Sequence, residues 1–409
     1  MRIFYLHQYF VTPKTQGGTR SYEFAKYLAQ KGHDVTVITS GLLNSQFPVS
    51  PKNNFKIYEY KGFKVAAIPA GYADARRGTS FSGRQRMIKF LQFARQATKV
   101  GKQLSSPDIV FATHTPLTIG YAGEKLATCF SVPFIFEVRD LWPEALINIG
   151  VLNNPLVIRY FRYLANRFYH SADHIVALSP GMKQGILKYG ISSSKVTVIP
   201  NASDLDLFQP EIKNSIIEEK INGRFSAIYF GAMGKANGLD YVIDAARLLK
   251  QQGNDDIVFI LHGDGSERQD LQRTVNNEKL NNVLFSDPVS EKTELAAIIS
   301  QCNVCMTIYK ATNEQTWSPN KMFDALAAGK PVLVNVGGWL GETIEKHQCG
   351  YQLDPGRPAD LADAVKKLST NPQQVDEMGE NARRLAEREF DRRKLAQKLE
   401  DVFVNMANP

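Results

Sequence analysis

The segment 318–329 carries side chains suited to holding a diphosphate. Ser318 fits the N-cap of a helix and the proline after it fits the first helical position, so unpaired backbone N–H groups would point at a ligand. Lys321 adds a positive charge, and Asn320 and Asp324 lie four residues apart, on one face of such a helix. We predict that Lys321 and the N–H groups hold the diphosphate and that the Asp324 carboxylate holds ribose hydroxyls. The alternative is that Lys321 and Asp324 form a solvated surface pair.

Glycine-rich turns after predicted strands offer a second kind of anion contact, because glycine lets backbone N–H groups approach a phosphate closely. One such turn lies in each half of the chain and precedes a helical pattern, and simple tight turns are the alternative. Their candidate donor-binding residues are Gly17, Gly18, Arg20, Lys235, Asn237 and Gly238. Asp264 lies in a third glycine turn, 263–265, which also fits an ordinary strand-to-helix turn with an aspartate cap. The spacing Gly-x-Gly-x-x-Gly of dinucleotide-binding proteins does not occur.

His114, Arg139 and Asp140 follow predicted strands of the first half, at the edge where open α/β sheets bind ligands. His114 can donate a hydrogen bond or titrate, and a structural histidine is the alternative. Asp140 and Glu144 are one helical turn apart, so one of them can act as a base or orient an acceptor hydroxyl. We predict that His114, Arg139 and Asp140 form the reacting part of the site. The sequence contains no nucleophile elbow, His-Glu-x-x-His motif or Walker loop, and we predict no metal site.

The elements that must position these residues are short Val/Ile/Phe-rich runs that alternate with longer amphipathic stretches. The predicted strands are 2–6, 34–39, 64–68, 108–112, 133–138, 174–178, 196–199, 225–230, 257–261, 282–285, 303–308 and 331–335. Continuous apolar runs indicate strands covered on both faces, as in a parallel sheet wrapped by helices. We therefore predict an α/β protein with two doubly wound, Rossmann-like domains, residues 1–200 and 205–389.

The composition is that of an ordinary globular protein, with 43% hydrophobic and 22% charged residues in a chain of 409. No apolar run is long enough to span a bilayer, and no secretory leader is recognisable at the start. Four scattered cysteines do not form a disulfide framework, and Cys302 and Cys305 are predicted to lie in a buried strand rather than at a metal. A cytoplasmic location is the simplest interpretation.

The net charge of +8 is unevenly distributed, with +15 in residues 1–200 and −7 in the remainder. The cationic half points to an anionic partner such as a membrane surface, a nucleic acid or a phosphorylated substrate. Arg76, Arg77 and the segment 84–104 form a basic patch in which cations alternate with apolar side chains such as Phe81. A basic amphipathic helix of this kind can lie on an anionic bilayer. The alternative is a domain helix with its apolar face on the sheet.

Four segments together resemble the retaining GT-B glycosyltransferases of family 4, over nearly the whole chain. They are the turn at 17–18, residues 198–208, the turn 263–268 and residues 324–332. The resemblance implies that the second domain binds a nucleotide sugar and the first binds the acceptor. It also implies that a final helix, 390–409, crosses back to the first domain and that reaction occurs in an interdomain cleft without an essential metal or other cofactor.

The sequence departs from the family pattern where members place an Arg and a Lys on the diphosphate, because Ala232 and Asn237 stand there. Asp324 replaces the second of two usual glutamates, and Thr316 falls at the first. Lys321 and Lys235 are then the cations expected at the diphosphate. The strings Ser-Pro-Asn-Lys and Met-Gly-x-Ala-Asn-Gly-Leu-Asp are similar to those of O-antigen and capsule enzymes, including N-acetyl-fucosamine transferases.

The resemblance therefore implies a retaining glycosyltransferase of bacterial surface polysaccharide synthesis. The expected donor is a UDP-linked N-acetylamino sugar, and the expected acceptor is a lipid-diphosphate-linked saccharide at the inner face of the cytoplasmic membrane. No nucleic-acid partner is expected. One alternative is an isomerase of the same architecture that epimerises UDP-N-acetylglucosamine. The other is a non-catalytic module that binds membrane or nucleic acid through its basic half.

Overall fold

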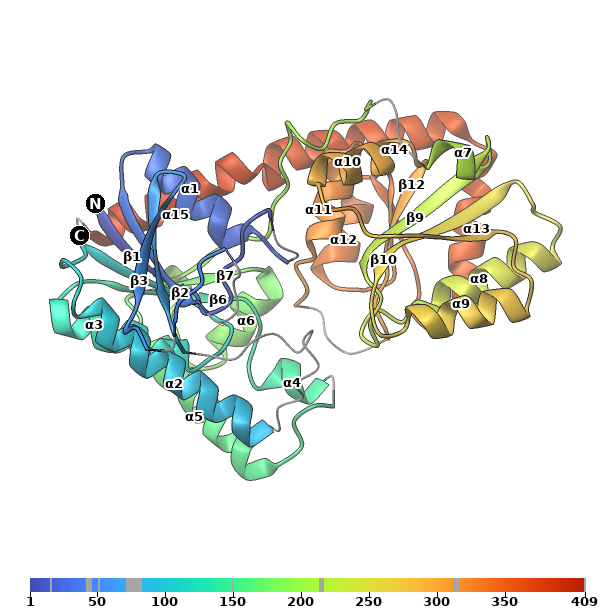
Figure 1. Ribbon diagram of the computed structural model, residues 1–409. Helices are drawn as coiled ribbons and strands as arrows, with labels where there is room; N and C mark the ends of the chain where they lie inside the picture. The colour runs from blue at the N-terminus through green and yellow to red at the C-terminus, as the bar shows by residue number, and fades with distance from the viewer. Residues whose placement is uncertain are drawn as a thin grey trace. The chain divides into compact units, whose positions relative to one another are not determined.

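The computed structural model describes residues 1–14, 17–41, 46–50, 52–70, 83–148, 150–212, 217–311 and 316–407. Arg76, Arg77 and Phe81 of the predicted basic patch lie outside these residues. The chain divides into two compact units (Figure 1). Unit 1 comprises Met1–Pro200 together with Ala396–Pro409, and unit 2 comprises Asn201–Leu395.

Unit 1 is built on an eight-stranded sheet with the order β3-β4-β2-β1-β5-β6-β7-β8. Its strands are β1 (Arg2–Leu6), β2 (Asp34–Ser40), β3 (Lys56–Tyr60), β4 (Phe63–Ile68), β5 (Ile109–Thr113), β6 (Phe134–Val138), β7 (His174–Ala177) and β8 (Val196–Val198). All neighbouring strands pair in parallel except β3, which pairs antiparallel with β4. The sequence prediction missed β3, an edge strand joined to β4 by a two-residue turn in which Lys61 and Gly62 both have positive φ.

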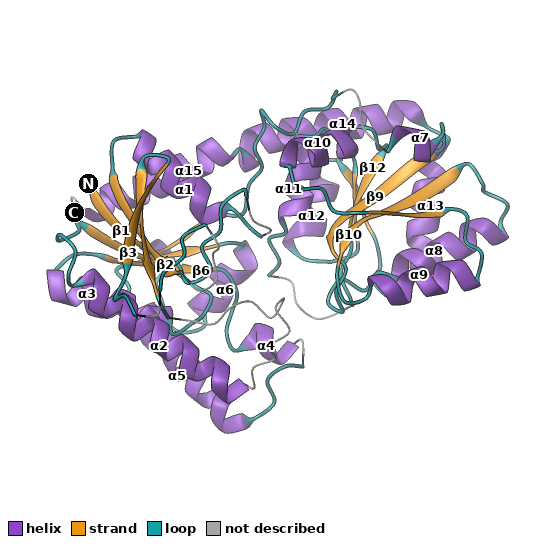
Figure 2. Cartoon of the chain, in the orientation of Figure 1, coloured by secondary structure: helices purple, strands orange, loops and turns teal. Residues whose placement is uncertain are grey.

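Helices cover both faces of this sheet (Figure 2). They are α1 (Arg20–Gln30), α2 (Gly83–Gly101), α3 (Ile119–Phe130), α4 (Glu144–Asn148), α5 (Pro155–Ser171), α6 (Pro180–Leu187) and the end of α15 (Arg392–Ala407). On one face, residues such as Phe93, Leu126 and Phe168 from α2, α3 and α5 form a continuous core. On the other face, the ring of Phe403 in α15 packs on Phe111, with 5.1 Å between ring centroids.

Unit 2 repeats the architecture with a six-stranded sheet of order β11-β10-β9-β12-β13-β14. Its strands are β9 (Phe225–Ala232), β10 (Ile257–Asp264), β11 (Val283–Ser286), β12 (Val304–Thr307), β13 (Val332–Val334) and β14 (Gly350–Gln352), all paired in parallel. Its helices are α7 (Glu218–Ile221), α8 (Asp240–Gln251), α9 (Arg268–Asn277), α10 (Lys292–Ser300), α11 (Asn320–Ala327), α12 (Trp339–Lys346), α13 (Pro358–Ser369) and α14 (Pro372–Leu385). Separate hydrophobic cores lie on its two faces. The prediction of two doubly wound parallel-sheet domains is confirmed.

The strand orders fix where a ligand would bind in each unit. The order reverses between β1 and β5 in unit 1 and between β9 and β12 in unit 2. Loops at such a point leave the sheet toward opposite faces, which opens a crevice at the carboxyl ends of the strands. The residues that follow β1, β5, β9 and β12 therefore border the expected ligand crevice of each unit.

Candidate functional site

In unit 2, Lys321 lies in the first turn of α11 beside the carboxyl end of β9. Its Nζ donates a hydrogen bond to the Tyr229 hydroxyl at 2.7 Å and sits 3.9 Å from the centroid of the Tyr229 ring. The Tyr309 ring centroid is 5.2 Å away. Burial lowers the pKa of this half-buried amine to about 7. Near neutral pH, the Lys321 amine is therefore divided between its neutral form and its ammonium form.

Two glycines keep the sheet edge beside Lys321 open. Gly231, next to the last residue of β9, has φ +128°, and a Cβ there would lie 3.7 Å from Lys321 Cε. Gly263 in β10 has φ +138°, and a Cβ there would lie 2.0 Å from the Gly231 carbonyl oxygen. A side chain is therefore excluded at Gly263, because the two backbones touch. This close approach adds exposed backbone to the tyrosine side chains that surround the lysine.

The glycine-rich turn after β9 is shaped by its own side chains. The Asn237 Oδ1 accepts a hydrogen bond from the Gly234 N–H at 3.2 Å. Gly238 has φ +55°, and a Cβ there would lie 2.8 Å from Lys310 Cα. Lys235 is exposed. Asn237 and Gly238 thus hold the turn in shape, and Lys235 is the cation that this turn presents.

The start of α11 differs from the prediction by one residue. The N-cap is Pro319 rather than Ser318, and no side chain caps the helix. The Ser318 hydroxyl instead accepts a hydrogen bond from the Asn201 N–H at 3.1 Å, and its carbonyl accepts one from the Asn201 side chain at 2.6 Å. Asn320 is exposed in the first turn. The first N–H groups of α11 therefore lack a capping side chain, which suits them to an anion.

The carboxylates of the predicted site make local contacts. Asp324 Oδ1 accepts a hydrogen bond from the Ser203 hydroxyl at 2.8 Å, and burial raises the pKa of Asp324. The solvated Lys321–Asp324 pair is therefore not the arrangement in the structure. The exposed Asp264 accepts a hydrogen bond from the Gly265 N–H at 2.8 Å, as in the turn considered from the sequence.

In unit 1, two histidines and an arginine gather after β1, β5 and β6. His114 is 1% exposed, and neither ring nitrogen has a partner among the described residues. Burial, and then the charge of Arg139, lowers the pKa of His114 to about 3. Arg139 Nη1 lies 3.5 Å from Nε2 of His7, a buried residue that the sequence interpretation missed. Its position directly after the first strand was the available signal.

The Trp142 ring packs against the His114 ring. The two rings meet edge to face with centroids 5.3 Å apart. Asp140 is exposed and accepts a hydrogen bond from the Thr115 hydroxyl at 3.1 Å. Glu144, the other carboxylate considered from the sequence, pairs with Arg162 at 3.1 Å. Asp140 is thus the exposed carboxylate of this cluster, and it can accept a hydrogen bond from a sugar hydroxyl.

Arg20 corrects a prediction, because its guanidinium is buried inside unit 1. Nε donates to Glu137 Oε1 at 2.9 Å, and the terminal nitrogens donate to the carbonyls of Pro200 at 2.5 Å and Ile199 at 2.8 Å. The Glu137 side chain is fully buried. Arg20 therefore ties the ends of β6 and β8 to α1 and does not present its charge to a phosphate.

Gly17 and Gly18 form part of the loop before α1. Gly17 has φ +140°, and a Cβ there would lie 3.1 Å from a methyl group of Val11. The N-cap of α1, Thr19, makes no capping hydrogen bond through its side chain. A glycine turn thus precedes the helix as predicted, and its binding role stays a prediction.

The basic segment 84–104 corresponds to α2, and its apolar face is buried. Phe90, Phe93 and Val100 belong to the core of unit 1. This arrangement favours the domain-helix alternative for that face. No helix in the described part of the chain combines the length and apolar character that crossing a membrane requires. Among the same residues, no three His, Cys, Asp or Glu side chains are grouped to hold a metal ion.

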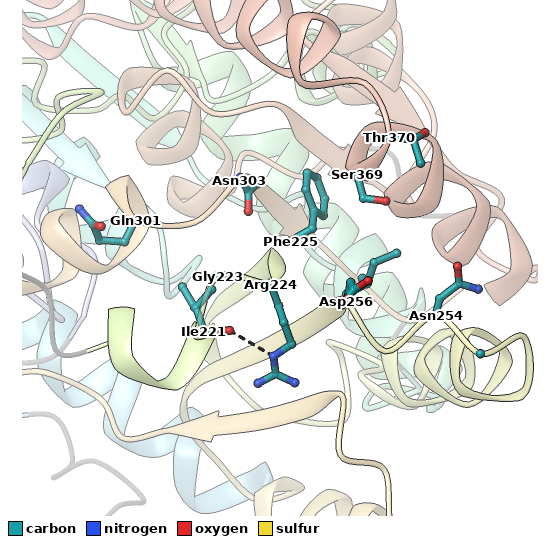
Figure 3. A pocket seen from close by; sticks show the side chains of 12 residues that line it. Ile221, Gly223, Arg224, Phe225, Asn254, Asp256, Gln301, Asn303, Ser369 and Thr370 are labelled. Atoms are coloured by element: carbon teal, nitrogen blue, oxygen red, sulfur yellow. Dashed lines mark hydrogen bonds between the residues drawn. The ribbon is translucent and has the colours of Figure 1, made fainter.

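A pocket of about 690 Å³ opens at the opposite edge of the unit 2 sheet (Figure 3). It is lined at the amino ends of β9 and β10 by residues such as Arg224, Phe225 and Asp256. Arg224 donates hydrogen bonds to three backbone carbonyls, those of Ile221, Asn281 and Lys220. The Arg224 guanidinium is thus occupied by backbone carbonyls. The pocket lies at the other end of the strands from Lys321.

Comparisons with known proteins match both halves of the chain. Residues 17–207 match the model "Glycosyltransferase Family 4", and residues 211–385 match "Glycosyl transferases group 1". An uncharacterized glycosyltransferase of Methanocaldococcus jannaschii is 20% identical over 388 residues, 94% of each chain. The D-rhamnosyltransferase WbpZ of Pseudomonas aeruginosa is 28% identical over 236 residues, 57% of this chain and 59% of its own.

Among solved structures, Anabaena HepE in complex with UDP superposes with a TM-score of 0.71 at 17% identity. The match covers 99% of this chain and 100% of that chain. At this identity the likeness concerns the fold.

Proposed function

Because this chain is a glycosyltransferase with the GT-B fold and domains of the family 4 type, we propose that it moves a sugar from UDP to a lipid-diphosphate-linked saccharide. The product belongs to a bacterial surface polysaccharide such as O-antigen or capsule. The transferred sugar is an N-acetylamino sugar, as the strings shared with O-antigen and capsule enzymes suggest. The enzyme works as a cytoplasmic, membrane-peripheral protein.

The observation that carries the proposal is the Lys321 amine above Gly231, at the uncapped start of α11. An ammonium and unpaired N–H groups at one sheet edge match a diphosphate in both charge and geometry. Ser203 occupies only one oxygen of Asp324, so the other oxygen can accept from ribose hydroxyls. Lys235 and the turn through Asn237 and Gly238 complete the donor side.

Unit 1 supplies the acceptor side through His114, Arg139 and Asp140. The reaction retains configuration: the acceptor oxygen bonds to the anomeric carbon on the face that the UDP oxygen leaves. The electrons of the broken carbon–oxygen bond pass to the diphosphate, which takes the acceptor proton. No protein nucleophile takes part. Lys321 and the N–H groups stabilise the charge that develops on the diphosphate, which is where they lower the barrier.

A screen of UDP-sugars against a synthetic polyprenyl-diphosphate saccharide, read by mass spectrometry, tests the proposal. A glycosylated lipid product from one UDP-sugar supports it, and nuclear magnetic resonance of the new linkage reports the configuration. Release of an epimerised sugar nucleotide from donor alone would indicate the isomerase instead. Transfer to soluble saccharides but not to the lipid-linked acceptor would remove the lipid part of the proposal.

A further inference from the structure

Helix α5 has apolar side chains on two different faces. One face, including Phe161, Leu164 and Phe168, is buried in the core of unit 1. The other carries Leu156, Tyr160 and Tyr163, which are 77%, 42% and 58% exposed. These three residues recur at the spacing i, i+4, i+7 and therefore form one outward stripe. Val151, just before the helix, is 64% exposed.

The same region is strongly cationic. Helices α2 and α5 together contain eight Arg and Lys residues and no Asp or Glu. Arg84, Arg86 and Arg159 are exposed. Some cations nearby are neutralised from other elements, since Arg162 pairs with Glu144 of α4 and Arg167 with Glu124 of α3.

The two helices present this region together. The ring of Trp142 lies 6.4 Å from that of Phe90 in α2 and 5.5 Å from that of Phe161 in α5, measured between centroids. Helix α3 packs against both helices, and all three contribute to the core on one face of the unit 1 sheet (Figure 1). Ile88 of α2 adds a further exposed apolar side chain, at 54%. The surface thus combines apolar and aromatic groups with arginines.

We propose that this surface, defined by Val151, Leu156, Tyr160, Tyr163 and Arg159 with the start of α2, docks unit 1 on an anionic lipid bilayer. Leucine and valine enter the acyl boundary, tyrosines lie at the headgroup level, and arginines contact lipid phosphates. The inference extends the proposed function, whose acceptor is lipid-linked, by naming the surface that meets the membrane.

The charge and the apolar side chains of this surface favour an anionic bilayer over a second copy of the chain or a nucleic acid. A second copy of the chain would bring two surfaces with an excess of positive charge together, which like-charge repulsion opposes. A nucleic acid would use the arginines but would leave the exposed leucine and valine without an apolar partner. A bilayer with anionic headgroups satisfies both kinds of side chain.

Sedimentation of the full chain with lipid vesicles tests the proposal, because it measures membrane binding in the absence of a sugar donor and of any sugar transfer. The vesicles contain phosphatidylcholine alone or with about 30 mol% phosphatidylglycerol. The double variant Leu156→Ser, Tyr163→Ser should bind the anionic vesicles at least about tenfold more weakly than the wild type. Arg159→Gln should weaken binding about fivefold at low salt. The matched control, Ile57→Ser, removes an exposed apolar side chain (44%) from β3 and should bind normally.

Equal binding of the double variant and the wild type would overturn the proposal, as would equal binding to neutral and anionic vesicles. Loss of binding in Ile57→Ser to the same extent would also overturn it. So would light scattering that shows a wild-type dimer dissociated by the double variant, because the surface would then be a self-association interface. The double variant should keep the wild-type thermal midpoint and UDP affinity, and these measurements separate failure of docking from failure of glycosyl transfer.

Discussion

Lys321 should make the affinity for a nucleotide sugar depend on pH in a way that a surface lysine would not. Burial lowers its pKa to about 7, and the groups that face it, Tyr229 and Tyr309, stay neutral because burial raises the pKa of each hydroxyl. A diphosphate binds the ammonium form, so binding above pH 7 must take up a proton. Affinity should be constant below pH 7, where the ammonium is already present, and should fall as the pH rises above 7.

The expected size follows from linkage. Each pH unit above 7 lowers the affinity by up to about tenfold, until the pKa of Lys321 in the complex is reached. Lys321→Ala should remove this slope and lower turnover by about ten- to a thousandfold. Tyr229→Phe keeps the ring under the amine but removes the 2.7 Å contact, so we expect about tenfold weaker binding at pH 8.

Calorimetric titration of a UDP-sugar between pH 6 and 9 measures these effects. A UDP-sugar is preferable to UDP, whose terminal phosphate itself titrates with a pKa of about 6. Two buffers with different heats of ionisation report proton uptake directly. Lys366→Ala, an exposed lysine of α13, is the matched control and should behave as wild type. A pH-independent wild-type affinity, or the same slope in Lys321→Ala, would refute the reasoning.

Three further predictions concern stability and the acceptor side. Arg20→Met leaves the Glu137 carboxylate buried without its partner and should lower the free energy of unfolding by about 3–5 kcal/mol. The double variant Arg20→Met, Glu137→Leu should recover much of this loss, and urea unfolding measures both effects. Gly263→Ala places a Cβ 2.0 Å from the Gly231 oxygen and should lower unfolding stability by at least about 1–3 kcal/mol, and an unchanged thermal midpoint would contradict the contact. His114→Ala should lower kcat by about tenfold or more and leave the affinity for UDP unchanged. Because the pKa of His114 is about 3, the pH profile of the wild-type kcat should show no inflection from this group between pH 5 and 8.

The fold was largely predictable because hydrophobic burial leaves a direct pattern in the sequence. Strand β5 is buried along its whole length and β1 is buried after its first residue, so both appear as apolar runs. Strand β3 mixes Lys and Glu with apolar residues at an exposed edge, and β14 is Gly-Tyr-Gln with a single aromatic residue, so neither produced such a run. Residues 318–329 predicted a helix, but its first residue depended on Asn201, which takes the Ser318 side chain away from the N-cap.

The site was less predictable because its properties come from contacts between distant segments. The sequence placed Lys321 correctly at the start of a helix, but its partner Tyr229 lies 92 residues away, and the lowered pKa follows from that packing. Arg20 shows the reverse case. Its position after a glycine turn indicated phosphate binding, and only the tertiary contact with Glu137 reveals its structural role.

In unit 2, the positive charge predicted for the diphosphate lies on a half-buried helix-terminal lysine and not in the turn after β9. The family pattern places cations at the positions of Ala232 and Asn237, whereas here the Ala232 carbonyl accepts from the Tyr229 hydroxyl at 2.6 Å and Asn237 braces the turn. In the proposed site the cation is instead Lys321, in the first turn of a helix, where the positive end of the helix dipole opposes an ammonium. Burial opposes the ammonium form as well, so the protein by itself disfavours this positive charge. An incoming diphosphate relieves both effects at once, so the charge appears mainly when the correct ligand is present, and a neutral sugar without its diphosphate gains little from this site.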